Sequence, residues 1–467
     1  MVESRTSSAP ELLLPLRRGT GEPLGRQLER QLRDAIRDGR LAPAGVLPST
    51  RALARQLGVA RGVVVAAYEQ LVAEGYLVSR PGATTSVARV PRPAPPAATE
   101  SLDEPFPIDF RPGRPDVREF PRDAWLRSLR RALDAAPATA FGYLDGRGAP
   151  ELRTTLASYL NRARGTCIAP GDMVISTGFA QGIQLVSRAL AGTGRRRIGV
   201  EDPYHPEYRA MIAASGLEVV GVPVDRHGLE LDHLDRLDLD AVVVTPAHQF
   251  PTGGVLPPER RAQLVAWAAR RDAIIVEDDY DAEFRYDRDP IGAVQGLCSD
   301  RVVYAGTASK MLAPGIRLGW LAIPRRLVEA VAAAKTAADH GSAVMDQLAL
   351  ADFIERGELD RHLRRMRPIY RRRRDALLDA LAEHLPALEP TGASAGLHVL
   401  AWLPEGIDER LVVAQAESAG IGLTGVAWCC QARPVRRGIV FGYAAMDERR
   451  IVEGVKRLAG LVSAARG

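Results

Sequence analysis

The chain has 467 residues, of which 46% are apolar, 25% charged and 5% aromatic, a composition that fits a soluble globular protein of about two or three folding units. No apolar run approaches the roughly 18 residues that a membrane-spanning helix needs, and the four cysteines form no CxxC pair. We therefore expect a reduced, cytoplasmic protein with no membrane contact, no disulfide framework and no metal site.

The net charge of +5 is unevenly distributed along the chain. Residues 1–98 contain 14 arginines and 8 acidic residues, whereas residues 99–467 carry almost equal numbers of basic and acidic residues. A basic domain beside a neutral one favours a polyanionic partner for the basic domain. A solvated basic surface without such a partner is the alternative.

The N-terminal region begins with two predicted helices. Apolar residues recur at every fourth position from Leu24 to Ile36, and this pattern, which ends at Gly39, is typical of an amphipathic helix. The stretch TRALARQL predicts a second, shorter helix with Ser49 or Thr50 as its N-cap residue. The Gly-Val pair that follows interrupts this second helix.

A third helix and a wing follow this break. The stretch ARGVVVAAYEQLVAEG predicts a helix with Arg61 and Gly62 at its N-terminal end, outside the apolar face. Two helices joined by a tight glycine turn form a helix-turn-helix, in which the second helix lies in the major groove of DNA. The stretch YLVSRPGATTSVA, residues 76–88, then predicts two short strands around a glycine turn, which would form a wing.

The segment LPSTRALARQLGVARGVVVAAYEQLVAEGYL resembles the GntR-type winged-helix signature. The resemblance implies that residues 1–88 form a winged helix-turn-helix domain that binds double-stranded DNA. Two departures are Ala60 and Val63, where the family often has hydroxyl residues that reach phosphate. A small helical interaction domain that binds no DNA is the alternative. The DNA contacts that the resemblance implies are Ser49, Thr50, Arg51, Arg61 and Gly62.

A proline-rich stretch follows the predicted wing. Residues 89–107 contain six prolines in nineteen positions. Proline fixes φ and lacks an amide donor, so we expect an extended, semi-rigid linker. This linker would separate the N-terminal domain from a larger domain over residues 108–467.

Residues 108–467 alternate helical stretches with short runs rich in Val and Ile, such as RIGVEDP, AVVVTPAH, AIIVEDDYD and RVVYAGTASK. Such runs are typical of a mostly parallel sheet that helices cover on both faces, and they predict an α/β fold. Sites in these folds lie at the carboxyl ends of the strands. The polar residues expected there are Glu201, Asp202, His248, Gln249, Glu277, Asp278, Asp279, Thr307, Ser309 and Lys310.

Lys310 lies among small and apolar residues in YAGTASKMLAPGIRLGW, in a chain that has three lysines beside 59 arginines. A lysine that forms a Schiff base must lose its proton, which desolvation and nearby cationic groups favour. Asp278, at the end of another apolar run, would supply the carboxylate that keeps a pyridine nitrogen protonated. A lysine combined with a strand-end aspartate predicts a pyridoxal phosphate (PLP) site. An ordinary solvated lysine is the alternative.

Residues 108–467 resemble the fold-type-I aminotransferases, whose large and small subdomains surround PLP. The stretches that carry this resemblance are FGYLDGRGAPELRTTLASYLNRARG, VEDPYHPEYR, TPAHQFPTG, VEDDYDAEFRY and GTASKMLAPGIRLGW. Together with the GntR-like N-terminal domain, they make the chain similar to the MocR/GabR family of PLP-dependent transcription regulators across almost its whole length.

The resemblance implies a role for each matching residue. Lys310 would hold PLP as an internal aldimine, Asp278 would pair with its pyridine nitrogen, and Tyr280 would lie near its phenolic oxygen. His205 would lie against the cofactor ring, and Tyr143 would reach the phosphate of the neighbouring subunit in a homodimer. The phosphate cup would consist of Thr307, Ser309, Arg317 and the backbone of Gly178 and Phe179.

Several positions depart from the aminotransferase pattern. Phe250 replaces the asparagine that holds the phenolic oxygen, His205 replaces the usual stacking aromatic residue, and Phe179 removes a hydroxyl near the phosphate. Val440 occupies the usual position of the arginine that binds the substrate carboxylate, with Arg437 as the nearest substitute. We therefore expect the cofactor to bind but not efficient turnover.

Two hypotheses about function remain. In the first, the protein is a transcription regulator whose aminotransferase-like domain senses PLP, or an amino compound that forms an aldimine with it, and thereby changes DNA binding. In the second, it is an active aminotransferase with an accessory N-terminal domain. We favour the first hypothesis because a GntR-like domain is fused to the aminotransferase-like domain. A residual transamination half-reaction is compatible with this hypothesis.

Overall fold

The structure, a computed structural model, describes residues 14–79, 84–89, 106–143, 145–286, 291–432 and 436–464. The chain divides into two compact units, Met1–Glu104 and Pro105–Gly467. Residues 80–83 of the predicted wing and residues 90–105 of the predicted linker lie outside the described ranges. None of the described helices is long and apolar enough to cross a membrane.

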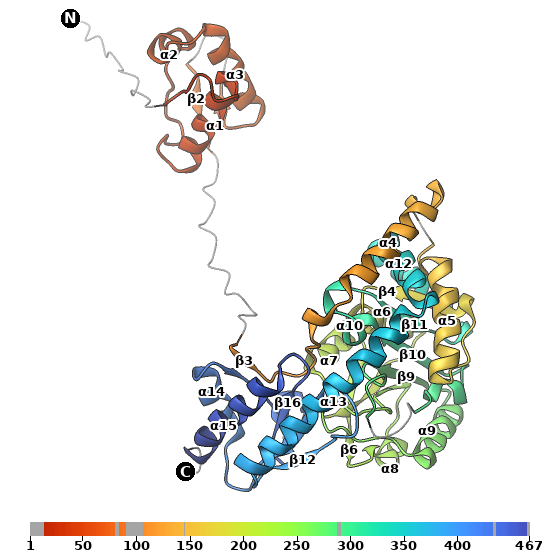
Figure 1. Ribbon diagram of the computed structural model, residues 1–467. Helices are drawn as coiled ribbons and strands as arrows, with labels where there is room; N and C mark the ends of the chain where they lie inside the picture. The colour runs from red at the N-terminus through yellow and green to blue at the C-terminus, as the bar shows by residue number, and fades with distance from the viewer. Residues whose placement is uncertain are drawn as a thin grey trace, which may run out of the picture. The chain divides into compact units, whose positions relative to one another are not determined.

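The described residues of the first unit form three helices and a pair of short strands (Figure 1). These elements are α1 (Leu24–Arg37), α2 (Thr50–Leu57), α3 (Arg61–Ala73), β1 (Leu77–Val78) and β2 (Ser86–Val87). The two strands pair in antiparallel fashion, and the apolar faces of the helices meet in a core that includes Leu28, Leu53 and Val64. This arrangement is the predicted winged helix-turn-helix.

Local signals define the turn between α2 and α3. The Ser49 hydroxyl caps α2 by accepting a hydrogen bond of 3.2 Å from the backbone N–H of Ala52. Gly58 ends α2 in the left-handed conformation, with φ of 63°, which glycine adopts without steric cost. The Tyr68 hydroxyl of α3 donates a hydrogen bond of 3.0 Å to the carbonyl oxygen of Pro48 and so fixes α3 against the start of α2.

A sheet of eight strands within the described residues forms the centre of the second unit, in the order β4-β11-β10-β9-β8-β5-β6-β7 (Figure 1). The strands from β10 to β6 run parallel, whereas β11 is antiparallel to both of its neighbours and β7 is antiparallel to β6. The sheet is therefore mostly parallel, as predicted. The strands are β4 (Met173–Ser176), β5 (Arg197–Asp202), β6 (Glu218–Asp225), β7 (Gly228–Leu229), β8 (Ala241–Val244), β9 (Ile274–Asp279), β10 (Val302–Thr307) and β11 (Gly319–Ala322).

Helices cover both faces of this sheet. Successive residues of a strand point to opposite faces, so Val276 of β9 joins one core while Ile275 joins the other. The first core packs against α6 (Phe179–Gly192), α7 (Pro206–Ala213) and α11 (Arg325–Asp339). The second core packs against α8 (Leu231–Arg236) and α9 (Pro258–Arg271).

A smaller antiparallel sheet with the order β12-β13-β16-β15 forms a second subdomain of this unit. Its strands are β12 (Glu389–Thr391), β13 (His398–Trp402), β15 (Thr424–Gly425) and β16 (Gly438–Gly442). The long helix α13 (Glu358–His384) packs against α15 (Glu448–Ala464) in this region (Figure 1). Strand β3 (Ile108–Asp109) pairs with β14 (Ile421–Gly422), so the start of the second unit lies beside its C-terminal part.

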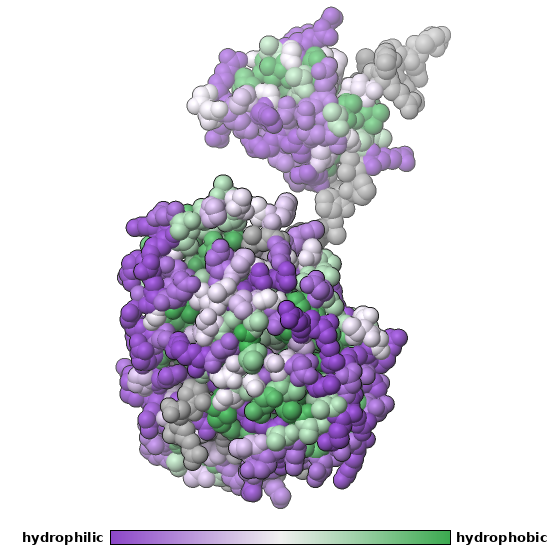
Figure 2. Space-filling view, turned by 90° about the vertical axis from the view of Figure 1, so that its right-hand side faces the viewer, coloured by the Kyte–Doolittle hydropathy of each residue, from purple (hydrophilic) through white to green (hydrophobic). Residues whose placement is uncertain are grey.

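The remaining helices complete the second unit. They are α4 (Arg122–Ala135), α5 (Pro150–Arg164), α10 (Ala308–Met311), α12 (Val344–Glu355) and α14 (Glu409–Ser418). The single-turn 3-10 helices are η1 (Val117–Glu119), η2 (Ala138–Phe141), η3 (Pro170–Asp172), η4 (Val294–Leu297), η5 (Pro314–Ile316) and η6 (Val426–Cys429). Helices α4 and α12 contact each other extensively. Figure 2 shows one face of the molecule, on which polar residues surround smaller apolar areas.

Candidate functional site

Lys310 lies on α10, directly after the carboxyl end of β10. Its Nζ atom donates a hydrogen bond of 2.5 Å to the carbonyl oxygen of Gly113. Burial lowers the pKa of Lys310 below its ordinary value of 10.5, although the carboxylates of Asp281 and Asp278 act in the opposite direction. The environment therefore brings this amine closer to the neutral form that a nucleophile needs.

Asp278 is buried at the carboxyl end of the neighbouring strand β9. Its Oδ2 atom accepts a hydrogen bond of 3.0 Å from the hydroxyl of Tyr204, whereas its Oδ1 atom is buried without a hydrogen-bond partner among the described residues. Burial raises the pKa of Asp278 well above its ordinary value of 3.8. A buried carboxylate oxygen without a partner is costly, so the site fits a ligand that brings a cationic donor, such as a protonated pyridine nitrogen.

The residues predicted for the phosphate cup lie near the N-terminus of α6. Gly178 precedes this helix with φ of 106°, a conformation that favours glycine, and a Cβ atom there would lie 3.2 Å from Nη2 of Arg317. The hydroxyl of Thr307 donates a hydrogen bond of 2.9 Å to that of Ser309. The start of a 14-residue helix beside a guanidinium group is suited to binding an anion such as phosphate, with the Phe179 N–H at the first helical position.

Aromatic side chains line the site on another side. The His205 ring stacks on Tyr208 with 4.5 Å between ring centroids and contacts Trp428 edge-to-face at 4.9 Å. The Phe250 ring lies 5.9 Å from that of His205. Burial, with the nearby positive charge of Lys310, lowers the pKa of His205 to about 4, so the ring is neutral near pH 7. The sequence analysis gave no role to Tyr208 or Trp428, because neither lies at the carboxyl end of a predicted strand.

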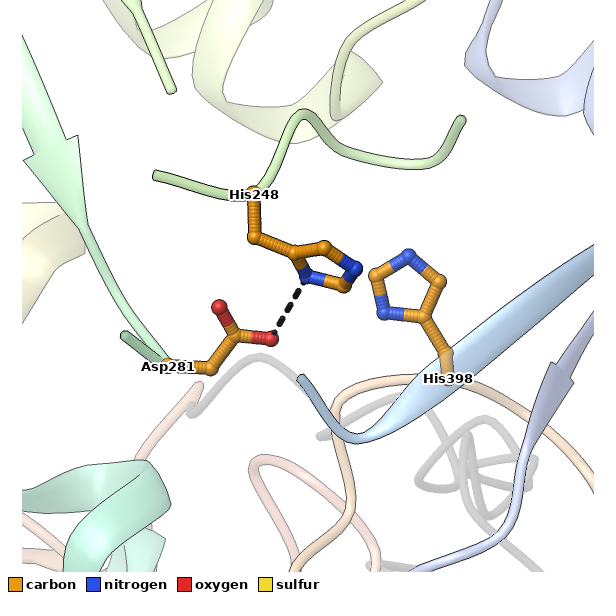
Figure 3. A group of neighbouring side chains, drawn as sticks. All are labelled: His248, Asp281 and His398. Atoms are coloured by element: carbon orange, nitrogen blue, oxygen red, sulfur yellow. Dashed lines mark hydrogen bonds and ion pairs between the residues drawn. The ribbon is translucent and has the colours of Figure 1, made fainter. Parts of the chain in front are cut away.

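The hydroxyl of Tyr280 points toward His248. It donates a hydrogen bond of 3.0 Å to the backbone carbonyl oxygen of His248 and lies 3.1 Å from Nδ1 of the same residue. His248 in turn contacts Asp281, with 3.0 Å between Nδ1 and Oδ2 (Figure 3). His398 lies beside this pair, and a ring nitrogen of each histidine and a carboxylate oxygen of Asp281 all lie within 4.8 Å of one another. The sequence marked His248 as a strand-end polar residue but gave Asp281 no role.

Two residues discussed for binding a substrate carboxylate have other partners. Val440 is buried in β16, in an apolar cluster with Leu400 and Val426. Arg437 donates a hydrogen bond of 3.2 Å to the carbonyl oxygen of Ile407 and forms a long ion pair with Asp408. Tyr143 is 96% exposed, and its ring contacts that of His340 edge-to-face with 6.5 Å between the centroids.

The predicted DNA-contacting residues gather where α2 and α3 begin. The side chains of Arg51 and Arg61 are exposed and, with Arg55 and Gly58, line an open hollow of about 530 Å³. Arg61 Nε donates a hydrogen bond of 3.4 Å to the hydroxyl of Thr50. The remaining predicted contacts are the α2 cap Ser49 and the exposed Gly62. This cluster presents positive charge at the N-terminal end of the second helix of the helix-turn-helix, where base and phosphate contacts are made.

The fold and the two sites define a class of protein, a winged helix-turn-helix joined to an aminotransferase-like fold. The family of bacterial regulatory proteins of the gntR type matches residues 24–87, and the family of class I and II aminotransferases matches residues 115–420. A multiple substrate aminotransferase from Thermococcus profundus has a similar structure, with a TM-score of 0.71 and 27% identity over 78% of this chain and 93% of that one.

Two relatives align with this chain over almost its whole length. The probable rhizopine catabolism regulatory protein MocR of Rhizobium meliloti is 32% identical over 96% of this chain and 95% of its own. The pyridoxine biosynthesis regulator PdxR of Corynebacterium glutamicum is 35% identical over 93% of this chain and 95% of its own. The chain therefore belongs to the MocR-type family of HTH transcriptional regulators, in which a GntR-type DNA-binding domain precedes an aminotransferase-like domain.

Proposed function

We propose that this regulator binds PLP on Lys310 and that the state of this site controls how the winged helix binds its operator DNA in the cytoplasm. The observation that carries the proposal is the buried Oδ1 atom of Asp278, which has no partner within the described chain and belongs to the same site as Lys310. PLP would supply the missing donor through its ring nitrogen and an aldehyde for the lysine.

Each part of the site has a place in this proposal. Lys310 would bind the cofactor covalently, Asp278 would hold its ring nitrogen, and Tyr280 would serve its phenolic oxygen. The neutral ring of His205 would face the cofactor ring. The phosphate would lie at the start of α6, among Gly178, Phe179, Thr307, Ser309 and Arg317.

A homodimer completes the proposal. Apolar side chains that are about half exposed or more extend along the segment that includes α4 and η2, namely Val117, Leu126, Leu133 and Phe141. Such side chains commonly pack against a partner. The exposed Tyr143 follows this segment directly, so a second copy that covers it would receive Tyr143 near its own phosphate cup.

The bond between Lys310 and Gly113 supports a route from the cofactor site to the N-terminal domain. Gly113 belongs to the segment that follows the predicted linker. In this segment, the Asp116 carboxylate accepts a hydrogen bond of 2.9 Å from Arg373, and the Asp116 backbone N–H donates one of 3.1 Å to the Tyr370 hydroxyl. When Lys310 is not bound to the cofactor, its Nζ atom would be free to donate to the carbonyl oxygen of Gly113, as in the structure, and an amine that took its place would restore this bond. We propose that this exchange is the signal, and that domains 1–88 and 108–467 communicate through residues 89–107.

The test is uptake of PLP by purified protein, followed by borohydride reduction and peptide mass spectrometry. We expect an absorption band above 400 nm and, after reduction, a modified peptide that contains Lys310 rather than Lys335 or Lys456. Lys310→Ala should lose both signals and keep its fold by circular dichroism. A wild-type protein that takes up no PLP would refute the proposal, and steady transamination would favour the aminotransferase hypothesis instead.

A further inference from the structure

A buried histidine and aspartate lie behind the tyrosine of the cofactor site. The side chains of His248 and Asp281 are 0% and 2% exposed, and 3.0 Å separate Nδ1 of the histidine from Oδ2 of the aspartate (Figure 3). They come from different segments, since His248 follows β8 and Asp281 follows β9. Two parallel strands therefore bring this pair together at their carboxyl ends.

The neighbours of His248 determine its protonation. Nδ1 faces the Asp281 carboxylate, and Nε2 lies 3.3 Å from the carbonyl oxygen of Gly392. Both partners are acceptors, so both ring nitrogens must carry hydrogen to satisfy them, and the ring is then an imidazolium. Burial alone would lower the pKa of His248, but the carboxylate of Asp281 raises it above the ordinary value of 6.5. Both observations favour the imidazolium form of His248, which together with the Asp281 carboxylate makes a buried ion pair.

The chain is built closely around this pair. A Cβ atom at Gly396, whose φ is 79°, would lie 2.2 Å from Cε1 of His248 and 2.5 Å from Oδ2 of Asp281. The hydroxyls of Tyr443 and Tyr286 hold the carbonyl oxygen of Gly396 at 2.6 and 2.7 Å. A Cβ atom at this position would clash with both members of the pair, so the close packing requires glycine here.

The pair acts on Tyr280. The tyrosine oxygen lies 3.1 Å from Nδ1 of His248, whose single hydrogen is shared with Asp281, and the tyrosine hydroxyl donates a hydrogen bond of 3.0 Å to the backbone carbonyl oxygen of His248. Two atoms of one residue thus fix the tyrosine hydroxyl. Phe250, which lies beside Tyr280, has no polar side-chain atom that could do so.

We propose that His248, held by Asp281, is a positioning residue that fixes the hydroxyl of Tyr280 and keeps a compensated positive charge beside the phenolic oxygen of the bound cofactor. The inference rests on the proposed function for the binding of PLP. Other ionisable groups that interact with the pair include His398 of β13, Arg285, Glu283 and Tyr286 after β9, Tyr443 after β16, and Asp278 and Lys310 within the site. Burial lowers the pKa of His398 well below 6.5, so this second histidine is neutral.

The test is a pH titration of the absorption band of the lysine-bound cofactor. His248→Gln removes the positive charge and leaves Asp281 unpaired, and a net negative charge nearby favours the protonated form of the cofactor linkage. We expect the titration midpoint to rise by about one pH unit or more. The double variant His248→Gln/Asp281→Asn is neutral and should return close to the wild-type midpoint. His398→Gln exchanges one neutral side chain for another in the same cluster and should leave the midpoint unchanged.

The outcomes separate this inference from the proposed function. Failure of the wild-type protein to take up PLP would refute both. A band that titrates at the wild-type midpoint in His248→Gln, with borohydride trapping on Lys310 intact, would overturn the role of His248 alone. If His248→Gln does not fold, Asp281→Asn serves instead. It removes the negative charge, so the midpoint must fall or stay unchanged, and a rise would contradict the proposal.

Discussion

Lys310 and Gly113 are joined by a hydrogen bond of 2.5 Å although 197 positions separate them in the chain. The bond connects the proposed cofactor lysine to the segment that leads back to the predicted linker. Loss or formation of one hydrogen bond can shift an equilibrium between two conformations by a factor of about ten. This contact is therefore a direct candidate for the coupling between the two units.

We predict that Gly113→Ala uncouples the cofactor site from DNA binding. The residue has φ of 82°, which strains any residue with a Cβ atom, and that atom would lie 3.2 Å from Nζ of Lys310, so the hydrogen bond between the lysine and the Gly113 carbonyl should be disturbed. Effector coupling is typically about 5- to 150-fold in affinity, and we expect it to fall below about twofold with PLP uptake retained. Fluorescence anisotropy with operator DNA measures it. Gly165→Ala is the control, because its φ of 62° imposes similar strain with no atom within 4 Å.

Tyr204→Phe should weaken PLP binding. The substitution removes the hydroxyl that donates a hydrogen bond of 3.0 Å to Oδ2 of Asp278. Because this bond stabilises the carboxylate, its loss should raise the pKa of Asp278 further. Loss of a hydrogen bond to a charged group costs about 1.5 to 3 kcal/mol, or roughly 10- to 100-fold in affinity for the cofactor. Equilibrium dialysis against PLP measures the change. Tyr159→Phe, on the buried face of α5, should bind PLP like the wild type, and equal losses in both variants would contradict this role for Tyr204.

The rate of PLP uptake should depend on pH through Lys310. Only the neutral amine attacks the aldehyde, so the rate rises as the ammonium loses its proton. Because burial lowers the pKa of Lys310 below 10.5, the midpoint of this rise should lie below that value. Stopped-flow absorbance at a series of pH values gives the midpoint. A midpoint at or above 10.5 would show that the amine is not perturbed in this way.

Arg61→Ala should reduce the salt dependence of DNA binding. If Arg61 contacts one phosphate, the slope of log K against log salt should fall by about 0.9, and affinity should weaken for all sequences alike. If it reads a guanine instead, the loss should be about 1 to 3 kcal/mol at a single base pair. Arg30→Ala is the control, because this exposed arginine lies on α1 and pairs with Glu22. Equal effects of both substitutions would argue against the placement of Arg61.

Much of the fold was accessible from local sequence signals. Ser49 was predicted as a possible cap of the second helix, and its hydroxyl does cap α2. Val- and Ile-rich runs that end in polar residues placed Asp278 at the carboxyl end of a buried strand, because such runs are typical of central parallel strands. The first helix ends at Arg37 rather than at Gly39, since Asp38 forms its C-cap.

The sequence did not reveal the contacts that complete the site. The bond between Tyr204 and Asp278 spans 74 positions, and that between His248 and Asp281 spans 33. These pairs depend on which strands become neighbours and on backbone approaches such as that of Gly396, which no local periodicity encodes. His248 was visible only as a polar residue after a strand, and its charge follows from two acceptors that the fold brings to it.

The central claim is that PLP bound on Lys310 controls DNA binding. The most direct measurement is the affinity of the full-length protein for its operator with and without PLP, for the wild type and for Lys310→Ala in parallel. We expect PLP to change the affinity of the wild type by at least about fivefold and to leave that of Lys310→Ala unchanged. Equal operator affinities of the wild-type protein with and without bound PLP would contradict this claim.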